Sequence, residues 1–531
     1  MKRLACLLLI AVLAFAPVTG RAQSGDEAFA ALASPSFETI RQGVGMLAVS
    51  GHPQAAVILS ALQANRLFVR TADKSLFIKA DDGSFVDAAT AKPAADVMAS
   101  GLKPVRVNNA VRGEVEAALG SLRLFAPDAA TRLTAAEAVF RSHDPAALPA
   151  FERALARESD AGVKLRMEQA RAAALLFADG SSEADRLAAI EVLRQRGDSD
   201  SRSLIGSLSA QTPAVAQAAA TAITGIDFNL QLWSILQSVY YGLSLGSVLL
   251  LAAAGLAITF GVMGVINMAH GEMVMIGAYV TFMVQQAIRE AAPGLFGASL
   301  LIAVPLAFIV AGLIGIAIER TLIRWLYGRP LETLLATWGL SLVLQQAVRS
   351  LFGPNNRDVG TPDWMSGATE LGHLTITYNR LYIIVFAFLV LAALMAALRF
   401  TSLGLAMRAV TQNRQMAAAM GIRTPWIDAL TFGLGSGVAG MAGVALSQID
   451  NVSPNLGQSY IIDSFMVVVF GGVGNLWGTV MGALTLGIVN KFLEPVAGAV
   501  LGKIVVLVLL ILFIQRRPRG MFPLKGRAAE A

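Results

Sequence analysis

Hydrophobic and polar positions divide the chain into two unlike halves. Over residues 229–318 the only charged side chains are those of Glu272, Arg289 and Glu290. A membrane-spanning helix needs about 20 mostly apolar residues, and a charge at the bilayer centre costs at least about 2.5 kcal/mol. The pattern therefore predicts a bundle of membrane-spanning helices from about residue 231 to 515.

Loop arginine and lysine residues predict how this bundle is oriented, because they concentrate on the cytoplasmic side. They gather at 320–329, at 401–426 and in the tail after residue 514, which we therefore expect in the cytoplasm. The polar segment 353–378 then faces the periplasm. The apolar stretches lie near 232–250, 252–268, 272–288, 299–318, 331–352, 380–399, 427–447, 460–490 and 498–515.

Counting crossings adds two constraints. A periplasmic start and a cytoplasmic end require an odd number, about nine, with three before the loop at 320–329. One stretch within 252–288 must then be broken or re-entrant, and 460–490 must hold two short crossings or a hairpin. Both regions contain an F-G-x-x-G pattern, at 260–264 and 470–474. Glycine-interrupted segments in corresponding halves indicate a transport site, and close helix packing is the alternative.

The first 22 residues predict a signal peptide. A basic start precedes an apolar run at 4–16 and small residues at 20–22, the order expected of such a segment. An uncleaved anchor helix is the alternative. Cys6 is the only cysteine and lies in this segment, so the mature chain would carry no thiol.

Residues 23–227 have the composition of a soluble, mainly α-helical domain, which the signal peptide places in the periplasm, and 228–531 form the membrane domain. A small hairpin is expected within 66–86. The pattern at 132–139 recurs at 186–193, which favours a HEAT-like helix stack; coincidence in an alanine-rich sequence is the alternative. A docking or structural role is expected for this domain.

Composition agrees with a membrane protein. Hydrophobic residues make up 55% of the 531 residues and charged residues 15%, against about 25% charged in soluble proteins. The net charge of +6 is largely that of the loop arginines, so no nucleic acid partner is expected. No phosphate-binding G-x-x-x-x-G-K-[ST] motif and no catalytic or metal-ligand cluster occurs, so we expect a non-enzyme without cofactors, driven by a partner's ATP hydrolysis.

Four segments resemble one family. They read GLAITFGVMGVINMAHGEMVMIGAYV at 255–280, LGLAMRAVTQNRQMAAAMGI at 403–422, VVVFGGVGNLWGTVMGA at 467–483 and RPRGMFP at 517–523. In this order they are similar to the permeases of ABC importers for branched-chain amino acids and urea. The resemblance implies an all-α polytopic protein of the bacterial inner membrane. It also implies a second homologous permease, two cytoplasmic ATPases and a periplasmic solute-binding protein as partners.

The large N-terminal domain and the segment 328–339 look like the urea branch of this family, so urea is the expected substrate. A branched-chain amino acid permease, a passive urea or solute channel and a membrane-anchored interaction protein are the alternatives. A channel would need neither ATPases nor a segment to contact them.

Polar residues in apolar segments are candidates for the substrate pathway, because they are costly in a bilayer. Asn267, His270 and Glu272 belong to this class, and a structural cap of a broken helix is their alternative. Glycines and polar residues of the second glycine-rich segment are expected to face them; an interfacial anchor is the alternative for the tryptophan. These are Gly471, Gly472, Gly474, Asn475 and Trp477.

The segment 403–422 looks like the one through which such permeases contact their ATPase. One face is expected to be polar and the other small. A helix lying on the membrane surface would look similar. The residues expected to carry the coupling are Arg408, Asn413, Arg414, Ala417 and Gly421.

Overall fold

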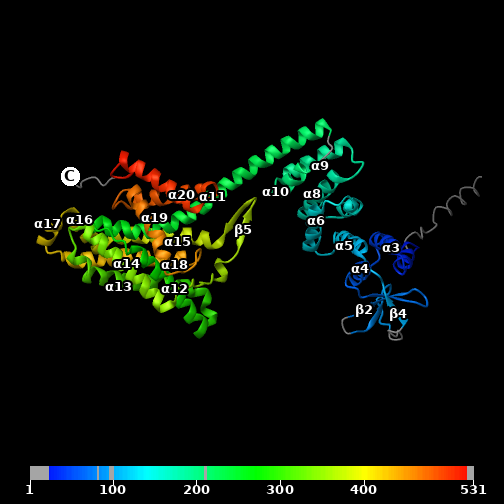
Figure 1. Ribbon diagram of the computed structural model, residues 1–531, viewed down its shortest axis with the longest axis horizontal. Helices are drawn as coiled ribbons and strands as arrows, with labels where there is room; N and C mark the ends of the chain where they lie inside the picture. The colour runs from blue at the N-terminus through cyan, green and yellow to red at the C-terminus, as the bar shows by residue number, and fades with distance from the viewer. Residues whose placement is uncertain (1–22, 81–82, 95–100, 209–211, 523–531) are drawn as a thin grey trace, which may run out of the picture. The chain divides into compact units, whose positions relative to one another are not determined.

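The computed structural model describes residues 23–80, 83–94, 101–208 and 212–522 of the chain (Figure 1). The predicted signal peptide and Cys6 lie outside the described residues. The chain divides into two compact units, one up to Leu230 and one from Gln231 onward. Each unit has hydrophobic cores of its own.

The first unit opens with three helices and a small antiparallel sheet. The predicted hairpin is confirmed, with Phe68 opposite Phe77, and Phe68 also meets the Phe85 ring edge-on. The sheet is larger than predicted, because two further strands extend it in the order β3-β2-β1-β4. The elements are α2 (Gln23–Leu32), α3 (Phe37–Val49), α4 (Ala55–Gln63), β1 (Leu67–Arg70), β2 (Leu76–Lys79), β3 (Phe85–Asp87) and β4 (Leu102–Pro104).

A stack of helices follows the sheet. The repeated sequence pattern falls at equivalent positions of α6 and α9, two helices of 14 residues. Asp144 and Asp198, which keep the same offset, each cap the short helix that comes next. The helices are α5 (Asn109–Arg123), α6 (Ala129–Ser142), η2 (Pro145–Ala147), α7 (Leu148–Leu155), α8 (Ala161–Phe177), α9 (Glu183–Arg196) and α10 (Ser199–Gly206).

Buried ion pairs fasten this stack. Arg196 at the end of α9 contacts Glu137 of α6 at 2.7 Å and Asp198 at 2.6 Å. Its guanidinium also lies 3.7 Å from the centroid of a phenylalanine ring. Arg132 of α6 pairs with Glu158 at 2.7 Å. The contact between Arg196 and Glu137 joins residues 59 positions apart in sequence and links α9 to α6.

The second unit is a helical bundle. Five of its described helical segments, at 213–263, 293–325, 378–400, 424–446 and 476–516, are long and apolar enough to cross a membrane. The elements are α11 (Pro213–Met263, which begins in the first unit), α12 (His270–Ala291), η3 (Pro293–Ala298), α13 (Ser299–Thr321), η4 (Ile323–Trp325), α14 (Pro330–Phe352), η5 (Asp363–Met365), β5 (Ala368–Leu371), β6 (Leu374–Thr377), α15 (Tyr378–Phe400), α16 (Ser402–Gln412), α17 (Arg414–Ala419), α18 (Thr424–Leu446), α19 (Leu456–Gly471) and α20 (Leu476–Arg516).

Two predicted stretches, 232–250 and 252–268, are wrong as separate elements. The single helix α11 runs through both and ends at Met263. Inside this helix no proline follows Pro213, and a proline is the residue that would remove a backbone donor and break it. Isolated glycines lower helix stability only modestly, so the glycines of this stretch did not mark a boundary.

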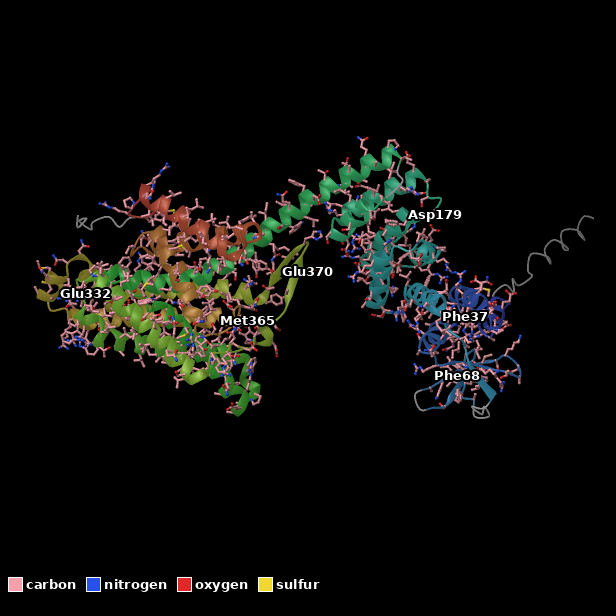
Figure 2. All side chains as sticks on the ribbon, in the orientation of Figure 1. Phe37, Phe68, Asp179, Glu332, Met365 and Glu370 are labelled. Carbon is pink, nitrogen blue, oxygen red and sulfur yellow. The ribbon has the colours of Figure 1, made fainter. Side chains whose placement is uncertain are left out.

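Opposite ends of the second unit carry different structures. Glu332, at the start of α14, and Glu370, in β5, lie at opposite ends (Figure 2). Helices α16 and α17 lie at the end that contains Glu332 (Figure 1). At the other end the β5–β6 hairpin holds α11, because Gln237 exchanges two hydrogen bonds of 3.1 and 2.9 Å with the Thr375 backbone.

Glycines let the bundle helices approach closely. A Cβ atom added at Gly242 would lie 2.6 Å from the Ile488 Cα atom, and one at Gly437 would lie 2.7 Å from the Phe308 ring. Contacts this short leave no room for a methyl group, so these helices pack closely at glycine.

Helices are interrupted at both glycine-rich segments, although the first interruption lies between α11 and α12 and not inside one helix. The first break, residues 264–269, separates α11 from α12, and the second break, residues 472–475, separates α19 from α20. Helix α20 itself turns at Gly498, where φ is +75°. Its second arm returns along α19, because the Phe513 and Phe470 rings lie 4.8 Å apart between centroids and Lys503 pairs with Asp463 at 2.8 Å.

Candidate functional site

The two breaks meet. A Cβ atom at Gly261 would lie 2.7 Å from the Gly474 Cα atom, so the two F-G-x-x-G segments are in backbone contact. Gly264, Gly472 and Gly474 all have positive φ, at +69°, +104° and +78°. Side chains rarely adopt this conformation, and this explains why glycine stands where the two helices stop.

Side chains satisfy the backbone of the first break. The Met268 N–H donates to the Thr337 hydroxyl at 3.1 Å, and the Ala269 N–H donates to the Asn267 side-chain oxygen at 3.0 Å. Buried backbone donors that leave a helix need such partners, because an unpaired buried donor costs about 1–3 kcal/mol. Asn267 is itself buried, so it holds the turn into α12.

His270 joins α12 to α11. Its Nε2 atom lies 2.9 Å from the Ala252 carbonyl oxygen, to which it donates. The side chain is buried, and its Nδ1 atom has no hydrogen-bond partner among the described residues. This contact gives His270 a structural role, because it attaches α12 to α11. The Nδ1 atom remains available as an acceptor.

Glu272 joins α12 to α14. Its Oε1 atom accepts hydrogen bonds of 2.8 Å from both the Ser341 hydroxyl and the Gln345 amide. The residue is 1% exposed, and its Oε2 atom has no partner among the described residues. Counted from Pro330, Ser341 is the twelfth of the 23 residues of α14. The carboxylate therefore lies at the middle of that helix.

The buried polar face of α14 was missed in the sequence because its residues were counted within the apolar stretch 331–352. Their spacing would have found them, since polar side chains recur every four residues and so share one helix face. All are buried. They are Thr333, Thr337, Ser341 and Gln345.

Asn475 caps α20 at the second break. Its side-chain oxygen accepts from the Trp477 N–H at 3.0 Å and the Gly478 N–H at 3.3 Å, and its amide donates to the Phe522 carbonyl at 3.2 Å. The tail also reaches Gly471, whose carbonyl accepts from the Phe522 N–H at 3.1 Å. Trp477 points away from the other candidates, with 64% of its surface exposed.

The predicted coupling segment, residues 403–422, folds into α16 and α17. Arg408 is exposed and donates to the Leu398 carbonyl. Asn413 caps α17 by accepting from the Met416 N–H at 2.9 Å. Ala417 lies on the buried face of α17, and Gly421, with φ of +88°, follows the end of this helix. The outward face of α17 therefore presents exposed methionine and alanine side chains.

Arg414 turns toward the bundle instead. It pairs with the fully buried Asp428 of α18 through two contacts, one of 3.2 Å, and lies 4.9 Å over the Tyr327 ring. The Tyr327 hydroxyl donates to Glu319 of α13 at 2.9 Å. Burial raises the pKa of the Tyr327 phenol, which therefore stays protonated and able to donate. We call Arg414, Asp428, Tyr327 and Glu319 the anchor network.

The chemistry available at the breaks is hydrogen bonding. Among the residues that the structure describes, no group of three histidine, cysteine or acidic side chains could hold a metal ion. Buried amide, hydroxyl, imidazole and carboxylate groups lie instead between apolar helices.

Comparison with known proteins gives one consistent result. Residues 238–514 match the family model described as the permease component of branched-chain amino acid transport systems. LivH of Salmonella typhimurium, a high-affinity branched-chain amino acid transport system permease protein, is 34% identical over 295 residues, which cover 54% of this chain and 94% of that protein. BraD of Pseudomonas aeruginosa, with the same description, is 32% identical over 298 residues, 55% of this chain and 96% of that protein.

A probable LivH of Methanocaldococcus jannaschii is 25% identical over 295 residues, 52% of this chain and 88% of that protein. No solved structure matches the chain. Both breaks, the anchor network and the α14 polar residues lie inside the matched region, whereas residues before 238 lie outside the family match.

Proposed function

Since the chain belongs to the family of permease components of branched-chain amino acid transport systems, we propose that it is the translocation subunit of an ATP-driven importer. Members of this family are multi-pass inner-membrane transport components and not enzymes, and the family implies ATPase and binding-protein partners. The observation that carries the proposal is the contact between the two breaks, Gly261 against Gly474. Glycine-interrupted apolar segments in corresponding parts of two halves point to a transport site.

The proposed threading has nine crossings: α11, α12, α13, α14, α15, α18, α19 and the two arms of α20. The segment 403–422 and the tail then lie in the cytoplasm, and the β5–β6 hairpin and residues 23–227 lie in the periplasm. The separation of α17 and the hairpin to opposite ends of the bundle supports this orientation (Figure 1), as does the concentration of loop arginines.

Branched-chain amino acids are the first candidate substrate. The relatives LivH and BraD carry this substrate in their descriptions and are matched over nearly their whole length. The expectation of urea has no such support from the relatives, so the amino acid alternative takes its place as the main proposal.

Urea is the second candidate. It is favoured by the N-terminal unit, which lies outside the family match and which the sequence resemblance associates with the urea branch. The buried groups at the first break also suit urea, because Asn267, His270 and Glu272 offer donors and acceptors to a small neutral amide. The amino acid and urea proposals share the same permease fold and energy source.

The proposed partners are a second homologous permease, two ATPases bound at α16 and α17, and a periplasmic solute-binding protein. The exposed methionine on α17 supports a docking role for this segment, as does the ion pair through which Arg414 attaches α17 to the bundle. The proposed pathway residues are those in and beside the two breaks. Trp477 is left out of this set, because it lies on the outer surface of the bundle.

Uptake of radiolabelled leucine and urea tests the function. Cells with and without the gene are compared before and after ATP depletion, with urease blocked so that metabolism does not draw urea inward. Gene- and ATP-dependent leucine uptake is the expected result. The same dependence for urea alone would select the second candidate, and uptake that survives ATP depletion would contradict both and favour a passive channel.

A further inference from the structure

The polar face of α14 is unusual for a membrane helix. Thr333, Thr337, Ser341 and Gln345 are all buried, whereas Leu335 on the same helix is largely exposed. Thr337 contacts the first break, and the next two residues along the face contact Glu272. A continuous line of hydrogen-bonding groups therefore runs from the break to the middle of α14.

Glu272 is the only charged group on this line, and half of its carboxylate is unused. Oε1 accepts from Ser341 and Gln345, while Oε2 is buried without a partner among the described residues. A buried acceptor left unpaired costs about 1–3 kcal/mol, and more when it is charged. The attachment of α12 to α14 uses only Oε1. It therefore does not explain why Oε2 is buried as well.

We propose that Glu272, with Ser341 and Gln345, forms an acceptor site beside the middle of α14 for the N–H groups of the transported solute. This inference rests on the proposed transport function. The ligand chemistry is an N–H donor, which an amino acid supplies through its ammonium group and urea through its amide groups. Ser341 and Gln345 are positioning residues, because their two bonds to Oε1 orient the carboxylate and leave Oε2 free to accept.

The variant Glu272→Gln distinguishes solute binding by Glu272 from its attachment of α12 to α14. A glutamine oxygen can still accept from Ser341 and Gln345, so the attachment of α12 to α14 is kept. The second oxygen is replaced by an NH2 group, which donates and therefore opposes another N–H donor. A purely structural role predicts little change, whereas an acceptor site predicts a loss of transport.

The experiment uses the complete importer with its partner subunits in proteoliposomes, with leucine and urea as separate radiolabelled probes. Glu272→Gln is expected to lower uptake of the transported probe at least about tenfold, the loss of one charge-assisted hydrogen bond, with unchanged thermal stability and ATP hydrolysis. Ser341→Ala is expected to raise the KM of uptake with a smaller effect on maximal rate. Thr281→Val is the control, because this buried hydroxyl on α12 bonds only the Gly277 carbonyl of its own helix.

The outcomes separate the two proposals. Uptake by Glu272→Gln within about twofold of the unaltered importer would overturn the acceptor site and leave the transport function intact. If that variant does not fold, an unchanged KM for Ser341→Ala would overturn it instead. An unaltered importer that moves neither probe with ATP would overturn the transport function, and the acceptor site with it.

Discussion

Removing Arg414 is predicted to harm the protein more than removing the acidic residue that it contacts. The Asp428 side chain is 0% exposed, whereas 43% of the Arg414 side chain is exposed. Arg414→Ala leaves a buried carboxylate without its cation, and a stranded buried charge costs about 3–5 kcal/mol. Asp428→Asn leaves an arginine that can turn to water, so it loses only charge-assisted hydrogen bonds, worth about 1.5 kcal/mol at an exposed partner.

The two variants therefore differ by about 2 kcal/mol, which corresponds to roughly a 30-fold difference in the ratio of attached to detached α17. Thermal unfolding of the complete importer and solute imported per ATP hydrolysed are the measurements. We expect Arg414→Ala to lower both strongly and Asp428→Asn to lower both mildly. The double variant should return to the level of Asp428→Asn, because no charge is then stranded.

A matched control is available at the same end of the second unit. Arg329 and Glu332 form an ion pair of 3.1 Å in which both side chains are exposed, and such pairs contribute about 0–1 kcal/mol. Arg329→Ala should therefore leave stability and coupling nearly unchanged. An Arg414→Ala variant no worse than Asp428→Asn, or a double variant as poor as the sum of both, would refute the anchor network.

Three further predictions follow from other contacts. Gly261→Ala places a Cβ atom 2.7 Å from the Gly474 Cα atom, so uptake per inserted molecule should fall, whereas Gly339→Ala, which meets open space, should transport normally. Arg196→Leu leaves two carboxylates without their cation and should destabilise the first unit by about 3 kcal/mol, measured by hydrogen exchange in α6 and α9. A hydrogen bond from its arginine partner lowers the pKa of Glu158 in the folded protein. The stability that this ion pair contributes should be complete above about pH 4.3, the pKa of an unperturbed glutamate, and should be lost as the pH falls through the lower folded pKa. Glu158→Gln should remove this pH dependence.

The breaks were predictable because glycine clusters marked where helices could stop. The parity set by the loop arginines is satisfied in another way, because α11 merges two of the predicted stretches into one helix. Gly264 and Gly472 do occupy conformations that side chains rarely adopt. The contact between the breaks was harder to predict, because a short shared motif carries no information about distance in space.

The helix faces were less predictable than the helix positions. Arg414 looked like a docking residue, since nothing nearby in the sequence suggested a buried partner. Asp428 lies 14 residues later at the start of an apolar stretch, and an acid in such a stretch is a functional or structural signal. Ser341 and Gln345 were missed for a related reason, because hydropathy averages over all faces of a helix and conceals one polar face.

A chain of tight contacts runs from α17 to the breaks. Arg414 attaches α17 to the start of α18 through Asp428. Two turns further along α18, a Cβ atom at Gly435 would lie 2.6 Å from the Gly255 carbonyl oxygen of α11, and Gly261 follows six residues later. Glycine contacts this close leave no compressible side chains between the two backbones, so a displacement of α18 must shift α11 or separate the helices. Packed interfaces respond to such displacements by switching between discrete arrangements, so we expect a displacement of α17 to reach the contact at Gly261.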